Sequence, residues 1–200
     1  MPTAEELITG LESPGAGDAA VEGLMALGKL ALSPLQQAVL DSNRSSEARQ
    51  LCAELLGQLV PDGVDWLLKT LSTSRNEAGD YAAWGLRFNY APGRIEKVLF
   101  DLASSTTTRV RLRAARALLF IHVDLKGWDS VVLRLTRDPD ERVRVAGMEL
   151  LVELAEADAL LDRLSLDEVI SAVEFAAQDA SQKVRSLGAE LGLLLKKGET

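Results

Sequence analysis

The chain has 200 residues, of which 47% are hydrophobic, 26% charged and 4% aromatic, and its formal net charge is −8. This length suffices for a buried core, and the negative charge disfavours nonspecific binding to nucleic-acid phosphates. The chain has one cysteine and one histidine, which excludes an intramolecular disulfide and a Cys/His metal cluster.

The N-terminal residues contain no basic segment followed by an apolar stretch, so we expect no signal peptide. No segment approaches the roughly 18 uninterrupted apolar residues that predict a membrane span. We therefore expect a cytoplasmic protein with no cofactor and no membrane partner.

The first helices are predicted from their start signals. Thr3-Ala-Glu-Glu6 is a capping box that predicts a short helix to about Glu12. Asp18 is expected to cap the second helix, whose apolar residues recur at spacings of three and four. Ser33-Pro34 predicts the start of the third helix, with the proline at its first position. The buried side of this helix is predicted to contain Leu35, Ala38, Val39 and Leu40.

The rest of the chain also reads as helices separated by polar or Pro/Gly-containing connectors. Asp138-Pro139 predicts a helix start with Asp138 as the cap, and Ser165-Leu-Asp-Glu168 is a second capping box. No strand-like alternation of useful length occurs, which indicates an all-α fold. The predicted helices are Glu47–Leu59, Val64–Leu71, Glu77–Asn89, Ile95–Leu102, Thr107–Val123, Trp128–Thr136, Glu141–Ala155, Val169–Ala177 and Ser181–Lys197.

A short unit recurs along these helices. Val110-Arg111 is followed by Ala114-Ala115 and then by two leucines, and the same order returns at Val143-Arg144 and at Val184-Arg185. A weaker copy starts at Ala48-Arg49. Recurrence about every 30 to 40 residues is the signature of stacked helix pairs.

We predict from this recurrence a right-handed α-solenoid of about five to six antiparallel helix pairs. The whole chain, residues 1–200, would form a single domain. Residues 1–16 would be an N-terminal capping helix, 17–180 the helix-pair repeats, and 181–200 a C-terminal capping helix.

The segment Asp138-Pro-Asp-Glu-Arg-Val-Arg-Val-Ala146 resembles the first-helix motif of HEAT-like repeats, in the short bacterial form of phycobilin-lyase-type proteins. The resemblance covers roughly Gly17 to the C terminus. It implies an interaction scaffold, an adaptor or an inhibitor of the immunity type, whereas a minority of such proteins act on bilins or alkylated DNA. It also implies that the repeated arginines pair with acidic residues of neighbouring turns, with Asp138 and Asp179 as candidate partners.

The charge along the chain is uneven. From Phe100 to Val145 there are nine Lys/Arg against six Asp/Glu, a net of +3, and both flanks are acidic. A nucleic-acid patch is one interpretation, but so small an excess is more typical of a solvated face. The acidic flanks favour a protein partner with a basic surface.

Aromatic residues gather in one part of the sequence, because six of the nine lie between Trp66 and Phe100. Tyr81 and Trp84 stand where Arg113 and Arg116 stand one unit later. These positions are expected to be exposed, and exposed aromatic residues are typical interface anchors. The alternative is that this unit packs differently, with Trp84 stacked beneath Arg116.

We find no catalytic set in the sequence: Cys52 occupies a core position equivalent to Ala114, and His122 lacks a partner at catalytic spacing. The favoured hypothesis is a noncatalytic protein-binding module, and the resemblance implies that second helices of the repeats line its concave face. The candidate partner-binding residues are Trp66, Lys69, Tyr81, Trp84, Arg94, Lys97, Arg113, Arg116, Trp128 and Arg134, with Glu174 as a further contact.

Two other hypotheses remain open. The first is an enzyme or chromophore handler, of the alkylated-DNA glycosylase or bilin lyase type, with a pocket made by the aromatic cluster and Asp65, Asp80 or Asp101. The second is a homo-oligomer that forms through an exposed aromatic face.

Overall fold

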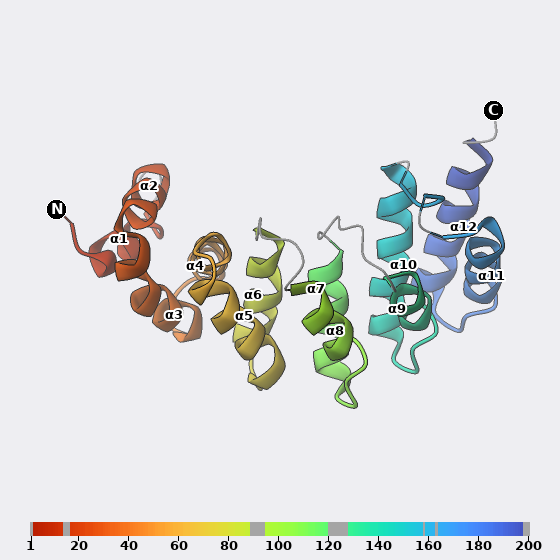
Figure 1. Ribbon diagram of the computed structural model, residues 1–200, viewed down its shortest axis with the longest axis horizontal. Coiled ribbons are helices and arrows are strands. Elements are labelled where there is room, and N and C mark those ends of the chain that lie inside the picture. Colours follow the sequence, from red (N-terminus) through yellow and green to blue (C-terminus); the bar gives the residue numbers. More distant parts are fainter. Residues whose placement is uncertain are drawn as a thin grey trace. The chain divides into compact units, whose positions relative to one another are not determined.

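The computed structural model describes residues 2–13, 17–88, 95–119, 128–157, 159–162 and 164–197, without the side chains of residues 128 and 197. Over these ranges the chain consists of helices and turns and has no β-strand, which confirms the predicted all-α repeat fold. The chain forms two compact units, which we call unit 1 (Met1–Val98) and unit 2 (Leu99–Thr200) (Figure 1).

Unit 1 is built around α4, which packs against α3, α5 and α6. Its core is aliphatic and includes Leu35, Leu56, Leu67 and Leu86, each fully buried. The helices of unit 1 are α1 (Ala4–Gly10), α2 (Gly17–Leu27), the 3₁₀ helix η1 (Gly28–Ala31), α3 (Leu32–Leu40), α4 (Ser46–Gln58), α5 (Asp62–Thr73), α6 (Ala78–Gly85) and the 3₁₀ helix η2 (Leu86–Phe88).

Unit 2 is centred on α10, which packs against α8, α9 and α12, while α11 packs against α12. Helix α7 (Ile95–Leu102) crosses the boundary between the units. The other helices of unit 2 are α8 (Thr108–Leu118), α9 (Trp128–Leu135), α10 (Glu141–Glu156), α11 (Leu166–Ala177) and α12 (Gln182–Lys197).

Both predicted capping boxes form. The Thr3 main-chain N–H donates to Glu6 Oε2 at 2.7 Å, and the Glu6 N–H donates to Thr3 Oγ1 at 3.3 Å. The same reciprocal pair joins Ser165 and Glu168 at the start of α11. Two orphan N–H groups at each helix start are thereby satisfied.

Three other predicted helix starts are wrong in detail. Asp18 lies inside the first turn of α2 rather than capping it. Helix α3 begins at Leu32, before Ser33-Pro34, because η1 joins it to α2 without an extended residue between them. The cap of α10 is Asp140, whose carboxylate accepts from the Arg142 N–H, while Asp138 forms an ion pair with Arg111.

Glycines allow α4 and α6 to touch through their backbones. A Cβ placed on Gly57 would collide with the carbonyl oxygen of Gly85, and a Cβ on Gly85 would collide with that of Ala53. Any larger residue at either position would push the helices apart. Cys52 lies on the same buried side of α4 and is fully buried, as predicted.

None of the helices in the described ranges is long and apolar enough to cross a membrane.

Candidate functional site

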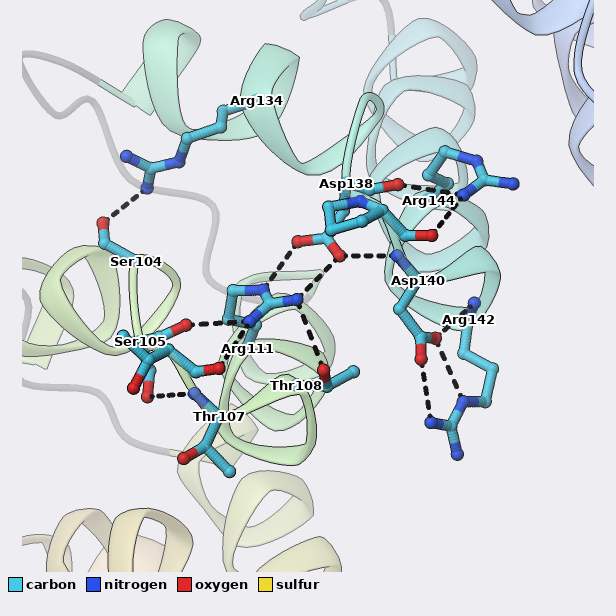
Figure 2. A network of polar contacts seen from close by, with 12 residues as sticks. Ser104, Ser105, Thr107, Thr108, Arg111, Arg134, Asp138, Asp140, Arg142 and Arg144 are labelled. Carbon is cyan, nitrogen blue, oxygen red and sulfur yellow. Dashed lines mark hydrogen bonds and ion pairs between the residues drawn. The ribbon is translucent and has the colours of Figure 1, made fainter.

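The repeated arginines of unit 2 form a ladder of ion pairs, and Figure 2 shows the pair of Arg111 with Asp138. Arg111 on α8 donates from Nε to Asp138 Oδ2 at 2.6 Å and from Nη2 to Oδ1 at 2.9 Å. Its third nitrogen, Nη1, donates to the main-chain carbonyl of Ser105 at 2.9 Å. A single side chain therefore ties α8 both to the loop before it and to the loop before α10.

Arg144 on α10 repeats the same arrangement. It donates from Nε and Nη2 to the Asp179 carboxylate at 2.6 and 2.9 Å, and from Nη1 to the Asp138 carbonyl at 2.9 Å. The hydrogen bond from Arg144 holds the pKa of the Asp179 carboxyl below its ordinary value, and the Ser181 N–H adds to this effect. The prediction that Asp138 and Asp179 pair with the repeated arginines is confirmed, so these arginines belong to the scaffold.

Unit 1 has a looser version of this contact. Arg49 on α4 is buried and donates to the Val39 carbonyl at 3.0 Å and to Glu77 Oε2 at 3.3 Å. Its guanidinium lies 4.5 Å from the centre of the Tyr81 ring, a cation–π contact. Tyr81 therefore lies against the arginine of the preceding repeat.

The aromatic residues of α6 are half-buried, which corrects the expectation that they are exposed. Trp84 donates its indole N–H to the Glu54 carboxylate, and the Arg87 guanidinium lies 3.7 Å from its ring centre. The Glu54 carboxylate on α4 satisfies the indole N–H, and the Arg87 guanidinium on η2 stacks on the ring face. An interface role for Tyr81 and Trp84 stays a prediction.

Arg113 contradicts its predicted place on the surface, because its side chain is fully buried. The helical period explains the burial: Arg113 shares a face of α8 with Val110 and Ala117, at i−3 and i+4, and both are buried. Arg116, one turn on, is exposed as expected. Only Arg116 of this pair has a surface to offer a partner.

A cavity of about 370 Å³ in unit 1 brings two predicted contact residues together. Trp66 is half-buried in it and Lys69 is exposed at one side. Leu40 is 49% exposed there, so its predicted place on the buried side of α3 is wrong. The cavity is lined by Leu40, Trp66, Lys69, Thr70, Thr73, Ser74, Arg75 and Asn76.

Sequence reasoning missed the polar part of this lining, from Thr73 to Asn76. These residues end α5 and form the connector to α6, and from the sequence they are indistinguishable from any other polar loop. An available signal was Leu40 itself, which falls at the last position of α3 immediately before a polar connector. A leucine at the last position of a helix has no following turn to cover it, so it is more easily left exposed.

The remaining predicted contacts lie apart from this cavity. Lys97 and Arg134 are exposed, and Arg134 donates to Ser104 Oγ at 2.6 Å within unit 2. Glu174 lines a second cavity of about 290 Å³ between α11 and α12. Arg94 and the side chain of Trp128 lie outside the described residues, as does His122.

In the described parts of the chain, no three His, Cys, Asp or Glu side chains are placed to hold a metal ion.

Neither a protein-family model nor a curated protein matches the chain. Solved structures do match it along nearly its whole length. A designed armadillo repeat protein in complex with the peptide (KR)4 has a TM-score of 0.52 and 16% sequence identity, covering 96% of this chain and 99% of that one. An engineered protein has a TM-score of 0.53 and 20% identity, covering 99% of this chain and 98% of its own.

At these identities the likeness concerns the fold alone. Together with the arginine ladder and the helix pairs, it defines the chain as a helical-repeat protein. Its fold is of the armadillo-like kind.

Proposed function

We propose that this chain is a noncatalytic cytoplasmic protein-binding module, a scaffold, adaptor or inhibitor built from HEAT-like repeats. The observation that carries the proposal is the unit 1 cavity, where the predicted contacts Trp66 and Lys69 meet the exposed Leu40. The pairing of Arg111 and Arg144 with aspartates of the next turn supports the HEAT-like assignment.

The chemistry of the cavity favours a segment of another protein as its ligand. The Trp66 ring and Leu40 offer an apolar surface for one anchoring side chain of the partner. Lys69 at the side favours a carboxylate or a main-chain carbonyl next to that anchor. A small apolar cavity with a polar rim suits an extended peptide better than a small polar metabolite.

The partner as a whole is expected to be basic. A net charge of −8 on this chain accelerates encounter with a positively charged protein and slows encounter with an acidic one. The designed armadillo repeat protein that shares this fold holds the basic peptide (KR)4. That complex supports a peptide ligand for the fold class, and the charge of this chain supports a basic one.

Affinity purification with paired variants tests the proposal. Leu40→Asp and Lys69→Glu change the cavity, whereas Leu30→Asp changes a leucine of unit 1 that is 78% exposed and does not line it. A partner that uses the cavity is recovered by the wild type and by Leu30→Asp, and is lost by both cavity variants. Recovery that is equal for all four proteins, or no stoichiometric protein at low salt, contradicts the proposal.

An enzyme or chromophore handler finds no comparable support. Tyr81 and Trp84 line neither of the two cavities described above, and the guanidinium groups of Arg49 and Arg87 lie over their rings. Mixing the protein with a bilin and recording absorbance, or with alkylated DNA in a gel shift, would reveal such an activity.

A further inference from the structure

We propose that one face of α12, made by Arg185, Ala189 and Leu193, is a second docking surface, and that it takes a helix of another protein preceded by an aspartate. We call these three residues the α12 face. They lie at i, i+4 and i+8, so they share one side of the helix. The proposal concerns unit 2 and stands independently of the unit 1 cavity.

The same three residue types form an occupied interface elsewhere in unit 2. Arg111, Ala115 and Leu119 have the same spacing at α8. Helix α10 packs against α8, Ala115 is fully buried, and Asp138, which precedes α10, accepts hydrogen bonds from Nε and Nη2 of Arg111. Here the arginine is bound by the aspartate that precedes the helix packed against its own.

The next repeat shows the same interface with larger side chains. On α10, Arg144, Met148 and Val152 occupy the equivalent positions. Met148 and Val152 are buried, α12 packs against α10, and Asp179 before α12 receives Arg144. In both cases an arginine with apolar residues four and eight positions later binds an aspartate that precedes a helix packed against its own.

The α12 face has the same chemistry but is open. Leu193 is 62% exposed, and Arg185 and Ala189 are exposed as well. The Arg185 Nη1 donates to the carbonyls of Asp179 and Ala180 at 2.6 and 2.8 Å, six and five residues before it. Within the described residues, no carboxylate bonds its Nε or Nη2.

Those two carbonyl bonds fix the orientation of the Arg185 guanidinium. Nη1 of Arg111 and Nη1 of Arg144 also donate to the main-chain carbonyls six and five residues before each arginine. In both cases Nε and Nη2 then donate to an aspartate. Arg185 is therefore preorganised for a bidentate carboxylate, which reduces the entropy lost on binding.

The required occupant follows from the two internal examples. Asp138 and Asp179 each stand three residues before the first residue of their helix, and each accepts the N–H two residues on, at 2.9 and 2.8 Å. A second copy of this chain cannot supply this aspartate from the described ranges. Only Asp138 and Asp179 stand three residues before a helix there, and each already binds an arginine of its own chain. We therefore assign the occupant to a partner protein that carries such an aspartate before one of its helices.

A helical peptide tests this surface. The probe is the synthetic peptide of residues 137–156, which contains Asp138 and α10, with Glu149→Lys bridged by a lactam to Glu153 to keep it helical. It is titrated into isotope-labelled full-length protein while the Arg185 Nε–H and Leu193 methyl resonances are followed by NMR. Both are expected to shift saturably, and loss of the charge-assisted bonds in an Asp138→Asn peptide should weaken binding about tenfold or more.

Variants of the protein complete the test. Arg185→Gln and Leu193→Asp are expected to weaken binding to a similar degree, and Leu193→Asp keeps the test valid if Arg185→Gln fails to fold. Lys183→Gln removes an exposed cation of the same helix outside the α12 face and should bind like the wild type. The proposal is overturned by absence of a saturable shift, by equal binding of the Asn peptide, or by a wild-type dimer that Arg185→Gln converts to a monomer.

Discussion

Replacing Arg144 by glutamine removes the ion pair that joins α10 to the loop before α12. The change deprives Asp179, whose side chain is 4% exposed, of both nitrogens that neutralise it, and leaves the Asp138 carbonyl without its donor. Removing one partner of a buried ion pair costs about 3–5 kcal/mol. Because water reaches part of Arg144, the lower end applies, about 3 kcal/mol, which corresponds to a fall of roughly 6–12 °C in the melting temperature of a chain this long.

Arg142 supplies the matched control, two residues away on the same helix. Its guanidinium also binds one carboxylate through Nε and Nη2, that of Asp140, at 3.1 and 3.0 Å, but the Arg142 side chain is 68% exposed. Arg142→Gln should therefore cost about 0–1 kcal/mol. Thermal melts followed by circular dichroism, with urea titrations alongside, compare both variants with the wild type. If Arg144→Gln melts within experimental error of Arg142→Gln, burial does not decide the strength of these pairs and the reasoning is refuted.

Three further predictions follow from the same structure. Since the pKa of Asp179 is lowered in the folded state, its stabilising effect is present above the unfolded pKa of about 4 and is lost as the pH falls through the folded value. The free energy of unfolding of the wild type should therefore drop more steeply below about pH 4 than that of Asp179→Asn, as acid titrations of urea melts would record; parallel curves would contradict this. Burial raises the pKa of the Cys52 thiol to about 12, so a thiol reagent at pH 8 should label the protein only after denaturant unfolds it, and rapid labelling of the native protein would show the site to be open. Gly85→Ala should destabilise unit 1 by about 1–3 kcal/mol, because the new methyl group meets the Ala53 carbonyl, whereas Gly17→Ala, with open space around it, should not; equal melting temperatures for the two would rule out the close approach of α4 and α6.

Those features of the fold that depend on neighbouring residues could be predicted from the sequence. The capping boxes at Thr3 and Ser165 need only a hydroxyl and a glutamate three residues apart. The pairing of Arg111 and Arg144 with aspartates was implied by the resemblance to HEAT-like repeats, and the repetition of the arginine favoured a scaffold role. Register alone also placed Cys52 in the core.

Features that depend on contacts between helices were harder to predict. The repeat register predicts an exposed Arg113, although its apolar neighbours at i−3 and i+4 favour the interior. The partners of Trp84 come from two other elements, Glu54 on α4 and Arg87 on η2. The cavity beside Leu40 likewise needs the end of α3 to meet the end of α5, which no local pattern encodes.

Asp138 belongs to two rungs at once, and this affects how unit 2 responds to mechanical force. Its carboxylate binds Arg111 while its main-chain carbonyl accepts from Arg144, which itself binds Asp179, so the hydrogen bond from Arg144 to Asp138 joins the ion pair between α8 and the loop before α10 to the ion pair between α10 and the loop before α12. Tension that separates α8 from α10 pulls on the loop that also orients Arg144. Stretched by its ends in an optical trap, unit 2 is therefore expected to yield in one event rather than helix by helix.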